Sequence, residues 1–300
     1  ATRSSASIGP MGFEGIEQGA PGGGGYGRAM RYRAIATDLD GTLLRSDRSV
    51  SPRTREAVHA AEDAGMLVVI ATGRPPRWIP PVIEELGDRG LVVCAYGASV
   101  YDPARHELVH RIDLAPDVAR SIVDDLEARL PDAVLGVEQG FDFGIDRRYR
   151  DTGVDILDLI PDITVAPIRS FLDEPVTKLI VRLPHPAPAG TAALVQEIVG
   201  SRALVTHSTH ESFLELSDPR VHKAHTVELL LEEHGHTAAD VVAFGDMPND
   251  LELIRWAALG VAMANAHPDL LAAADLVTTT NDDDGVARVI ERLLDGSLDG

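Results

Sequence analysis

Short apolar runs that end abruptly in polar residues recur along the chain. They are nearly continuous rather than alternating, which predicts strands buried on both faces, as in parallel sheets. Between them lie segments with apolar residues at helical spacing, bounded by Ser-Pro or Gly signals. The strands are expected at 34–37, 66–71, 91–95, 241–244, 259–263 and 276–278, and the helices at 52–64, 223–233, 251–256 and 286–294. This alternation predicts an α/β fold with a doubly wound parallel sheet (Rossmann-like).

The pattern changes between about residues 101 and 216. Short strands and two helices there predict an α+β domain inserted into the parallel one. Its strands are expected at 100–101, 108–110, 134–137, 178–183, 203–206 and 213–216, and its helices at 116–130 and 191–199. We expect a core of residues 31–98 and 217–300 with an inserted domain of residues 99–216. The stretch 147–175 has no clear pattern, and residues 1–30, rich in Gly, Ser and Pro, are expected to be a disordered extension.

Composition narrows the class of protein. A hydrophobic share of 44% and a charged share of 25% are typical of a soluble globular protein. The 27 basic and 47 acidic residues give a formal charge of -20, which argues against a nucleic-acid or anionic-membrane partner. No apolar stretch approaches the roughly 20 residues of a membrane span, and no signal-peptide pattern is evident, so we expect a cytoplasmic protein. The oligomeric state is left open.

Polar clusters follow three of the predicted strands. In a parallel sheet these strand ends lie on one edge, so residues about two hundred apart in sequence meet in one pocket. The clusters are Asp38 and Asp40, then Thr72 and Gly73, then Asp246, Asn249 and Asp250. An Asp-x-Asp-Gly sequence also occurs in turns and calcium loops. An EF-hand, however, needs a Glu six residues after the Gly, where Asp47 stands.

Carboxylates from two strands favour a hard divalent cation, and Mg²⁺ suits carboxylates together with a substrate phosphate. With such an ion, Asp38 can attack phosphorus as a nucleophile and Asp40 can serve as the acid and base. The Thr72 hydroxyl and the Gly73 N–H can hold the phosphate. The chain has only two lysines, Lys178 and Lys223, and Lys223 is expected to supply a cation to the phosphate.

Four ordered motifs carry a family resemblance. They are Asp38-Leu39-Asp40-Gly41-Thr42-Leu43, Thr72-Gly73-Arg74, Lys223, and Gly245-Asp246-Met247-Pro248-Asn249-Asp250. Over about residues 32–295 the chain resembles the haloacid dehalogenase superfamily, in its Cof-type branch (subfamily IIB), whose α+β cap lies between the second and third motifs. The resemblance implies metal ligation by Asp38, the Asp40 carbonyl and Asp246.

The same resemblance implies roles for further residues. It places Asn249 on the phosphate and gives Asp250 a supporting role toward Lys223 or the water shell of the metal. Many members carry Asn-Gly-Ala after the third strand, whereas this chain has Tyr96-Gly97-Ala98, so Tyr96 is expected to reshape the pocket mouth.

The sequence thus predicts a Mg²⁺-dependent phosphomonoester hydrolase that acts on a small soluble organic phosphate, such as a sugar phosphate, through an aspartyl-phosphate. The cap would select the leaving group. Candidates for contacting the substrate from the cap are Glu138, Arg147, Arg148 and Lys178. His207, His210 and His222 are interpreted as cap-loop or surface residues, because their spacing fits no helical pair of metal ligands.

Other functions fit less well. A dehalogenase has no need for the acid/base Asp40, and a phosphomutase of this superfamily usually has a cap after the first motif, where 44–66 is too short for one. A transport ATPase needs membrane spans. The alternative from another class is a catalytically idle protein that binds or senses a metabolite, and the intact Asp38 and Asp40 argue against it.

Overall fold

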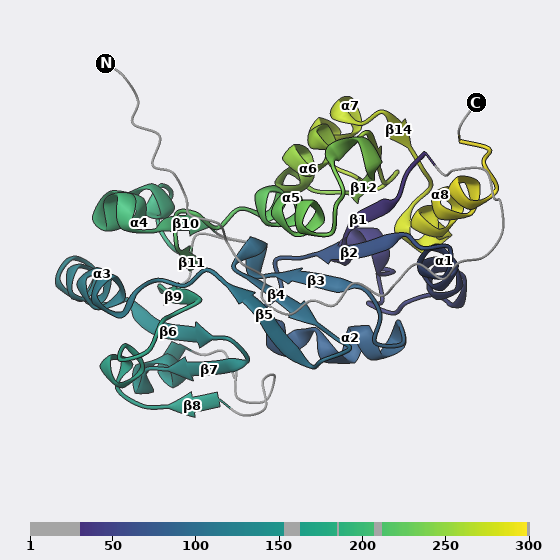
Figure 1. Cartoon of the computed structure of the whole chain (residues 1–300). Helices are drawn as coiled ribbons and strands as arrows, with labels where there is room; N and C mark the ends of the chain where they lie inside the picture. The colour runs from purple at the N-terminus through teal and green to yellow at the C-terminus, as the bar shows by residue number, and fades with distance from the viewer. Residues whose placement is uncertain (1–30, 153–162, 185, 207–211, 299–300) are drawn as a thin grey trace, which may run out of the picture.

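A computed structural model describes residues 31–152, 163–184, 186–206 and 212–298. It contains two β-sheets, one of eight strands and one of six, with helices packed on both (Figure 1). The α/β class with a parallel sheet is therefore confirmed. None of the helices in these ranges is long and apolar enough to cross a membrane.

The eight-stranded sheet has the order β14-β13-β12-β1-β2-β3-β4-β5. Its first six strands in this order are parallel, and the hairpin of β4 and β5 is antiparallel. The strands are β1 (Ala34–Asp38), β2 (Leu67–Ala71), β3 (Leu91–Cys94), β4 (Ser99–Asp102), β5 (Glu107–Arg111), β12 (Val241–Gly245), β13 (Leu259–Ala262) and β14 (Leu276–Val277). All five residues of β1 and of β12 are buried, as the continuous apolar runs predicted.

Helices cover both faces of this sheet (Figure 1). They are α1 (Pro52–Asp63), α2 (Pro80–Glu85), α5 (Lys223–Glu233), α6 (Leu251–Trp256), α7 (Pro268–Ala273) and α8 (Gly285–Leu294). The chain steps from β1 to β2 in one direction and from β12 to β13 in the other, so right-handed crossovers place α1 and α6 on opposite faces. Helix α8 packs on α1, and α5 packs on α6.

The hairpin of β4 and β5 lies in the core sheet, which corrects its expected place in the inserted domain. A tight turn at Ala95–Gly97 reverses the chain after β3, so β4 runs back along it. All of β4 is buried, and Val100 and Tyr101 belong to the same hydrophobic cluster as β1 and β2. The hairpin therefore completes the edge of the core, and the second sheet begins only at Val134.

The six-stranded sheet forms the cap. Its strand order is β10-β11-β9-β6-β7-β8, antiparallel except for the β7–β8 pair. The strands are β6 (Val134–Gln139), β7 (Asp142–Ile145), β8 (Ile163–Val165), β9 (Lys178–Arg182), β10 (Leu204–Thr206) and β11 (Phe213–Ser217), and the helices are α3 (Pro116–Arg129) and α4 (Thr191–Val199). The stretch 147–175, left unassigned from the sequence, holds β8 and two short 3₁₀-helices, Arg147–Thr152 and Ile168–Phe171.

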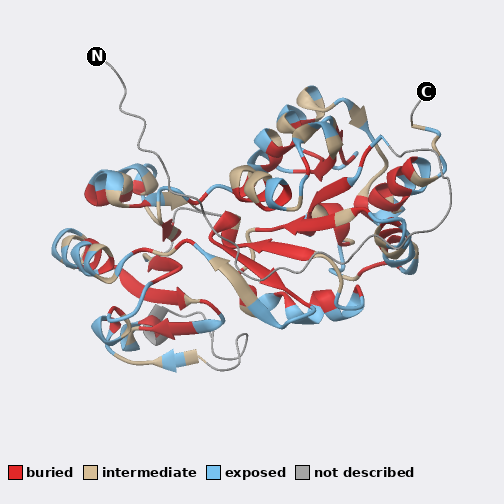
Figure 2. Cartoon of the chain, in the orientation of Figure 1, coloured by how far each residue is buried: buried red, intermediate tan, exposed pale blue. Residues whose placement is uncertain are grey.

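Alternation along the cap strands separates two faces. Leu179 and Val181 of β9 join a hydrophobic cluster with α3 and α4, whereas Ile180 belongs to a cluster on the other face with Phe143. Figure 2 shows buried residues along both sheets. Because α3 and α4 cover one face, the second face is left to contact the core.

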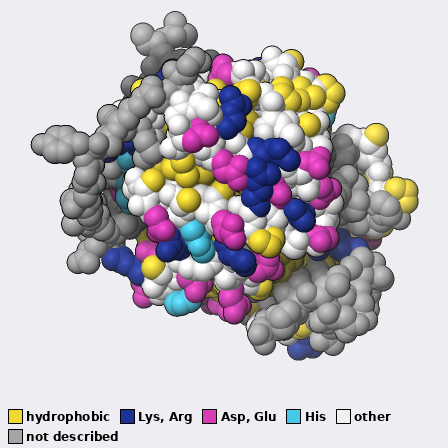
Figure 3. All heavy atoms as spheres, turned by 90° about the vertical axis from the view of Figure 1, so that its right-hand side faces the viewer, with side chains coloured by type: hydrophobic (Ala, Val, Ile, Leu, Met, Phe, Trp, Pro, Cys, Tyr) yellow, Lys and Arg dark blue, Asp and Glu magenta, His cyan; other side chains and the backbone are white. Residues whose placement is uncertain are grey.

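The outer face of the core carries mixed charge. Figure 3 views the side of the molecule that bears α1 and α8, where Arg side chains lie among Asp and Glu side chains. One such pair joins the two helices, with Arg53 and Glu291 separated by 2.6 Å. The view shows no broad basic patch on this face.

Candidate active site

Three strand ends meet at one edge of the core sheet, as the sequence predicted. Strand β1 lies between β12 and β2, and all three run in the same direction. Asp38 is the last residue of β1, Asp246 directly follows β12, and Thr72 directly follows β2. Residues more than two hundred positions apart therefore lie side by side, with Asp246 accepting a hydrogen bond from the hydroxyl of Thr42 at 3.0 Å.

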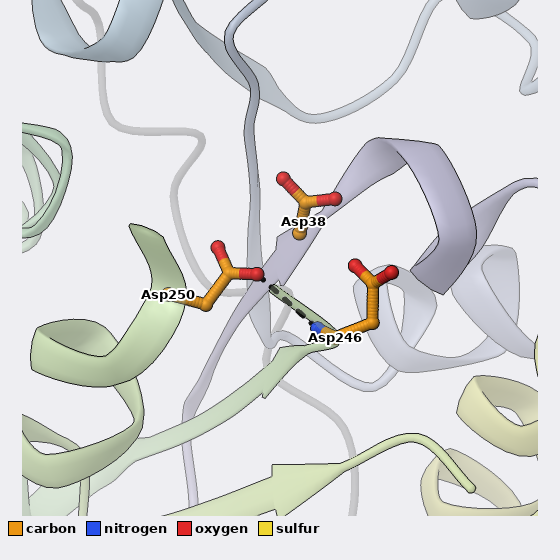
Figure 4. A group of neighbouring side chains, drawn as sticks. All are labelled: Asp38, Asp246 and Asp250. Atoms are coloured by element: carbon orange, nitrogen blue, oxygen red, sulfur yellow. Dashed lines mark hydrogen bonds between the residues drawn. The ribbon is translucent and has the colours of Figure 1, made fainter. Parts of the chain in front are cut away.

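Three carboxylates gather at this edge, and we call Asp38, Asp246 and Asp250 the acidic triad. One oxygen from each lies within 4.8 Å of the others, a spacing that could hold a metal ion (Figure 4). Asp250 stands just before α6, and its second oxygen accepts the backbone N–H of Asp246 at 3.2 Å. All three are buried. A cluster of hard oxygen ligands suits a divalent cation.

Lys223, the first residue of α5, lies beneath the acidic triad and is 4% exposed. Its amine donates hydrogen bonds to Asp38 and to Asp250, the latter at 2.6 Å. Burial works against the charged amine, but Asp38 and Asp250 outweigh burial and raise the pKa of Lys223 above its usual value. Lys223 is therefore held as a cation.

One lysine does not offset three carboxylates. Burial raises the pKa of Asp38 well above its usual value, although Lys223 beside it acts in the opposite direction. Burial, followed by the charge of Asp250, raises the pKa of Asp246 to about 6. A bound divalent cation would lower both pKa values. The excess of negative charge thus fits the divalent metal that the donor set indicates.

The loop after β1 is shaped by Gly41. Its φ is +77°, and a Cβ at this position would collide with the carboxylate of Asp246. The Gly41 carbonyl accepts a hydrogen bond from the side-chain amide of Asn265 at 2.8 Å, which fixes the loop from the end of β13. Glycine is therefore required here for both the backbone conformation and the close approach of Asp246.

Asp40 lies at the mouth of the site rather than in the acidic triad. Its side chain is 52% exposed, and both of its oxygens accept hydrogen bonds from Arg74, at 2.8 and 2.5 Å. The two-pronged contact orients Asp40 toward the pocket opening. Its backbone carbonyl, rather than this side chain, is the group that the sequence analysis assigned to a metal.

Thr72 and Gly73 form the turn after β2. The Thr72 hydroxyl accepts the N–H of Arg74 at 3.1 Å, and the Thr72 carbonyl accepts the N–H of Tyr96 at 3.0 Å. A Cβ on Gly73 would lie 2.5 Å from the Tyr96 ring, so this ring occupies the space that only glycine leaves free. Tyr96 itself has a φ of +58°, a backbone conformation that costs of order 1 kcal/mol or more for a bulky residue.

A cavity of about 320 Å³ lies between the core and the cap. Its core wall includes Asp38, Asp40, Thr72, Gly73, Met247 and Asn249. Its cap wall consists of Glu138, Phe143, Ile180, Phe213 and Glu215, which lie on four neighbouring strands of the face that α3 and α4 leave uncovered. The cap thus closes over the carboxyl edge of the core sheet, where ligands bind in open α/β sheets.

The comparisons with known proteins agree with this geometry. The sequence model of the haloacid dehalogenase-like hydrolase family matches residues 35–290. The chain belongs to this family. Phosphatase YwpJ of Bacillus subtilis (strain 168) is 30% identical over 285 residues, which are 87% of this chain and 100% of the relative. The enzyme named 5-amino-6-(5-phospho-D-ribitylamino)uracil phosphatase YitU, from the same strain, is 27% identical over 262 residues, 86% of this chain and 96% of the relative.

A solved structure described as the subclass IIB sugar phosphatase BT4131 has the same fold. Its TM-score is 0.71 at 21% identity, and the match covers 87% of this chain and 98% of that one. The resemblance of the sequence to this family is thereby confirmed, and so is the prediction that the chain is an enzyme of the haloacid dehalogenase-like hydrolase type. Among the described residues, the acidic triad is the group that could hold the divalent metal such hydrolases typically use.

Two buried ion pairs lie at the cap side of the pocket, and we call them the cap pairs. Arg77, from the loop after β2, donates to Glu138 at 3.0 Å, and the Lys178 amine donates to Glu215 at 2.9 Å. The side chains of all four residues are 12% exposed or less. The Lys178 amine also lies 5.0 Å from the centre of the Tyr96 ring. Buried charged groups therefore lie at the cap side of the pocket of this hydrolase.

The cap candidates from the sequence divide into two groups. Glu138 and Lys178 form part of the cap pairs. Arg147 is exposed, and Arg148 contacts Asp146 and the Pro131 carbonyl; neither of these arginines lines the pocket. The sequence predicted no role for four residues that the structure places at the site, namely Arg77, Glu215, Thr42 and Asn265.

Of the three histidines considered above, the structure describes only His222. His222 lies at the surface and pairs with Glu252, as expected for a residue outside the metal site. His207 and His210 lie outside the described residues, as does the predicted N-terminal extension 1–30.

Proposed function

We propose that this hydrolase is a Mg²⁺-dependent phosphomonoesterase for small organic phosphates and that it works through an aspartyl-phosphate on Asp38. The observation that supports this best is the environment of Asp38. It is a buried carboxylate at a strand end, paired with Lys223, and it borders a cavity that Thr72, Gly73 and Asn249 also line. Relatives named as phosphatases are consistent with it.

The metal that suits the acidic triad is Mg²⁺. Hard carboxylate oxygens are its preferred protein ligands. The negative charge around Asp38 and Asp246 exceeds the positive charge of Lys223, so a divalent cation would balance it. Bound there, Mg²⁺ would screen the carboxylates from a phosphate dianion and polarise the phosphoryl oxygens. Asp38, the Asp40 carbonyl and Asp246 would hold it, and Asp250 would position Lys223.

The reaction has two displacements at phosphorus. An oxygen of Asp38 forms a bond to phosphorus while the bond from phosphorus to the leaving oxygen breaks, and Asp40 gives its proton to that oxygen. A water then attacks the phosphorus of the aspartyl-phosphate and gives a proton to Asp40. The bond between phosphorus and the Asp38 oxygen breaks, so phosphate is released and Asp38 is restored. Because Arg74 holds Asp40 in the structure, this ion pair must open for Asp40 to exchange a proton with the substrate.

The remaining residues hold the phosphoryl group. Thr72, Gly73 and Asn249 line the cavity, and Lys223 places a cation beside Asp38. We expect the Thr72 hydroxyl, the Gly73 N–H and the Asn249 side chain to bind the phosphate. Such preorganised donors stabilise the charge that develops during phosphoryl transfer.

The test is phosphate release from a panel of sugar, polyol and aryl phosphates, with Mg²⁺ and with a chelator, comparing the native protein with Asp38→Asn. We expect release that requires both Mg²⁺ and Asp38. If the native protein binds one of these esters but releases no phosphate from any of them, the enzyme mechanism is wrong and a metabolite-binding role replaces it.

A further inference from the structure

The cap wall of the pocket is apolar except at the two cap pairs. Phe143, Ile180 and Phe213 provide the apolar surface, and Glu138 and Glu215 are the cap residues with charged groups facing the cavity. The side chain of Glu138 is only 5% exposed. Such a wall meets the part of the substrate that leaves with the ester oxygen, because the acidic triad lies at the other end.

Each carboxylate on this wall is matched by a cation. Glu138 binds Arg77, and Glu215 binds Lys178. Burial alone would lower the pKa of Lys178, but the charges of Glu215 and Glu138 outweigh it and raise that pKa, so the amine stays protonated. The leaving-group end therefore carries two positive and two negative charges and is neutral as a whole.

No cation on the pocket wall is left for an anionic leaving group. Among the described residues that line the cavity, the basic side chains are Arg74 and Arg77, and each is already bound to a carboxylate. The acidic side chains there are Asp38, Asp40, Glu138 and Glu215. A carboxylate on the leaving group would thus be buried beside Glu138 and Glu215 without a partner, which is costly.

Unused hydrogen-bonding groups lie just behind this wall. The second carboxylate oxygen of Glu138 and the Nε and Nη1 atoms of Arg77 are buried and have no hydrogen-bond partner among the described residues. A hydroxyl group can donate to a carboxylate oxygen and accept from a guanidinium N–H at the same time. A small rotation of these two side chains toward the cavity would therefore let them bind an uncharged alcohol.

We propose that Glu138 and Glu215 determine the charge selectivity of the enzyme, so that it accepts esters with an uncharged, hydroxylated leaving group and rejects those with an anionic one. This inference rests on the proposed phosphomonoesterase function and names the substrate class for it. It also assigns the selectivity to two carboxylates that neither react nor touch the phosphoryl site. Removing the charge of either one leaves its cation unmatched beside the cavity, which favours an anionic leaving group.

The experiment compares two sugar esters that carry phosphate on the terminal hydroxymethyl carbon: those of glucose and gluconate. Their leaving groups are neutral and anionic, respectively. With Mg²⁺ present, we expect kcat/KM of the native protein for the glucose ester to exceed that for the gluconate ester by about tenfold or more, because unpaired like charges disfavour binding. Equal values, or a preference for the gluconate ester, would overturn the proposal.

Glu215→Gln and Glu138→Gln then test the assignment separately, so that one variant suffices if the other fails to fold. Each is expected to shift the gluconate-to-glucose ratio of kcat/KM about tenfold toward gluconate. The matched control is Asp113→Asn, which removes a carboxylate of similar exposure, 13%, that pairs with Arg111 outside the pocket lining. Its ratio should stay at the native value.

The outcomes separate this inference from the function on which it rests. Mg²⁺-dependent release from an aryl phosphate with unchanged ratios in both variants would overturn the selectivity role and leave the phosphomonoesterase intact. Release from no ester would overturn both.

Discussion

The two lysines of the chain are both buried, yet they lie at opposite ends of the pocket in different charge balances. Lys223 is one cation beside the three carboxylates of the acidic triad. Lys178 belongs to the cap pairs, which contain two cations and two carboxylates. The first end is short of positive charge and fits a divalent ion. The second is neutral and fits an uncharged group. The comparison shows that the count of buried charges, more than the residue type, indicates what each end binds.

Removing the core lysine should have the largest effect. Lys223→Met leaves Asp38 and Asp250 buried without their shared cation, so we expect the free energy of unfolding to fall by about 3–5 kcal/mol. Turnover should fall by about a hundredfold or more, because a fixed positive charge beside the phosphoryl group is lost. Urea unfolding and steady-state kinetics measure the two effects.

Mg²⁺ provides the control for this variant. The ion should return part of the lost stability, because it supplies charge to the same carboxylates. If Lys223→Met were as stable as the native protein, with or without Mg²⁺, the interpretation that the acidic triad lacks positive charge would be wrong.

Removing the cap lysine should have a smaller and different effect. Lys178→Met leaves the largely buried carboxylate of Glu215 without this ion-pair partner, so we expect the free energy of unfolding to fall by about 1–3 kcal/mol, a loss that Mg²⁺ does not restore. Discrimination against a gluconate ester should increase, opposite to the shift expected for Glu215→Gln. If Mg²⁺ restored the stability of both lysine variants equally, the proposed difference in charge balance between the acidic triad and the cap pairs would be wrong.

The Tyr96 ring lies between Gly73 of the core and Lys178 of the cap. Its substitution is expected to have the smallest effect on stability. Gly73→Ala forces a Cβ against the Tyr96 ring, whereas Tyr96→Asn removes the ring and suits the positive φ better. We expect Gly73→Ala to be less destabilising in the Tyr96→Asn background, with a coupling of about 1 kcal/mol. A double-mutant cycle by urea unfolding measures it, and strictly additive effects would show that the ring is not the obstacle.

Much of the core could be predicted because its information is local. Three of the apolar runs ended in polar clusters, and the rule that parallel strands end on one edge was enough to bring Asp38, Thr72 and Asp246 together. The helix that begins at Pro52 followed from its N-cap, since Ser51 accepts the N–H of Thr54. Asn265 was harder to predict, because it lies in the turn after β13 and donates to the Gly41 carbonyl of a segment 224 residues away.

The cap was less predictable because its contacts join distant segments. The hairpin of β4 and β5 was assigned to the cap by its position in the sequence, but its pairing with β3 decides its sheet. Glu215 stands between Leu214 and Leu216, both buried, so a carboxylate on the opposite face of that strand was a usable signal. Its partner Lys178 lies 37 residues away, and only strand register brings the two together.

The most direct test of the account is to trap the aspartyl-phosphate. Asp40→Asn keeps the nucleophile but removes the group that activates water, so a phosphoryl group should accumulate on Asp38. The variant is mixed with Mg²⁺ and an aryl phosphate, whose leaving group needs no acid, then quenched in acid and examined by peptide mass spectrometry. The account predicts a phosphorylated peptide containing Asp38 that hydroxylamine cleaves and that is absent from Asp38→Asn. Turnover by the native protein with no phosphoryl group on Asp38 in the variant would contradict it.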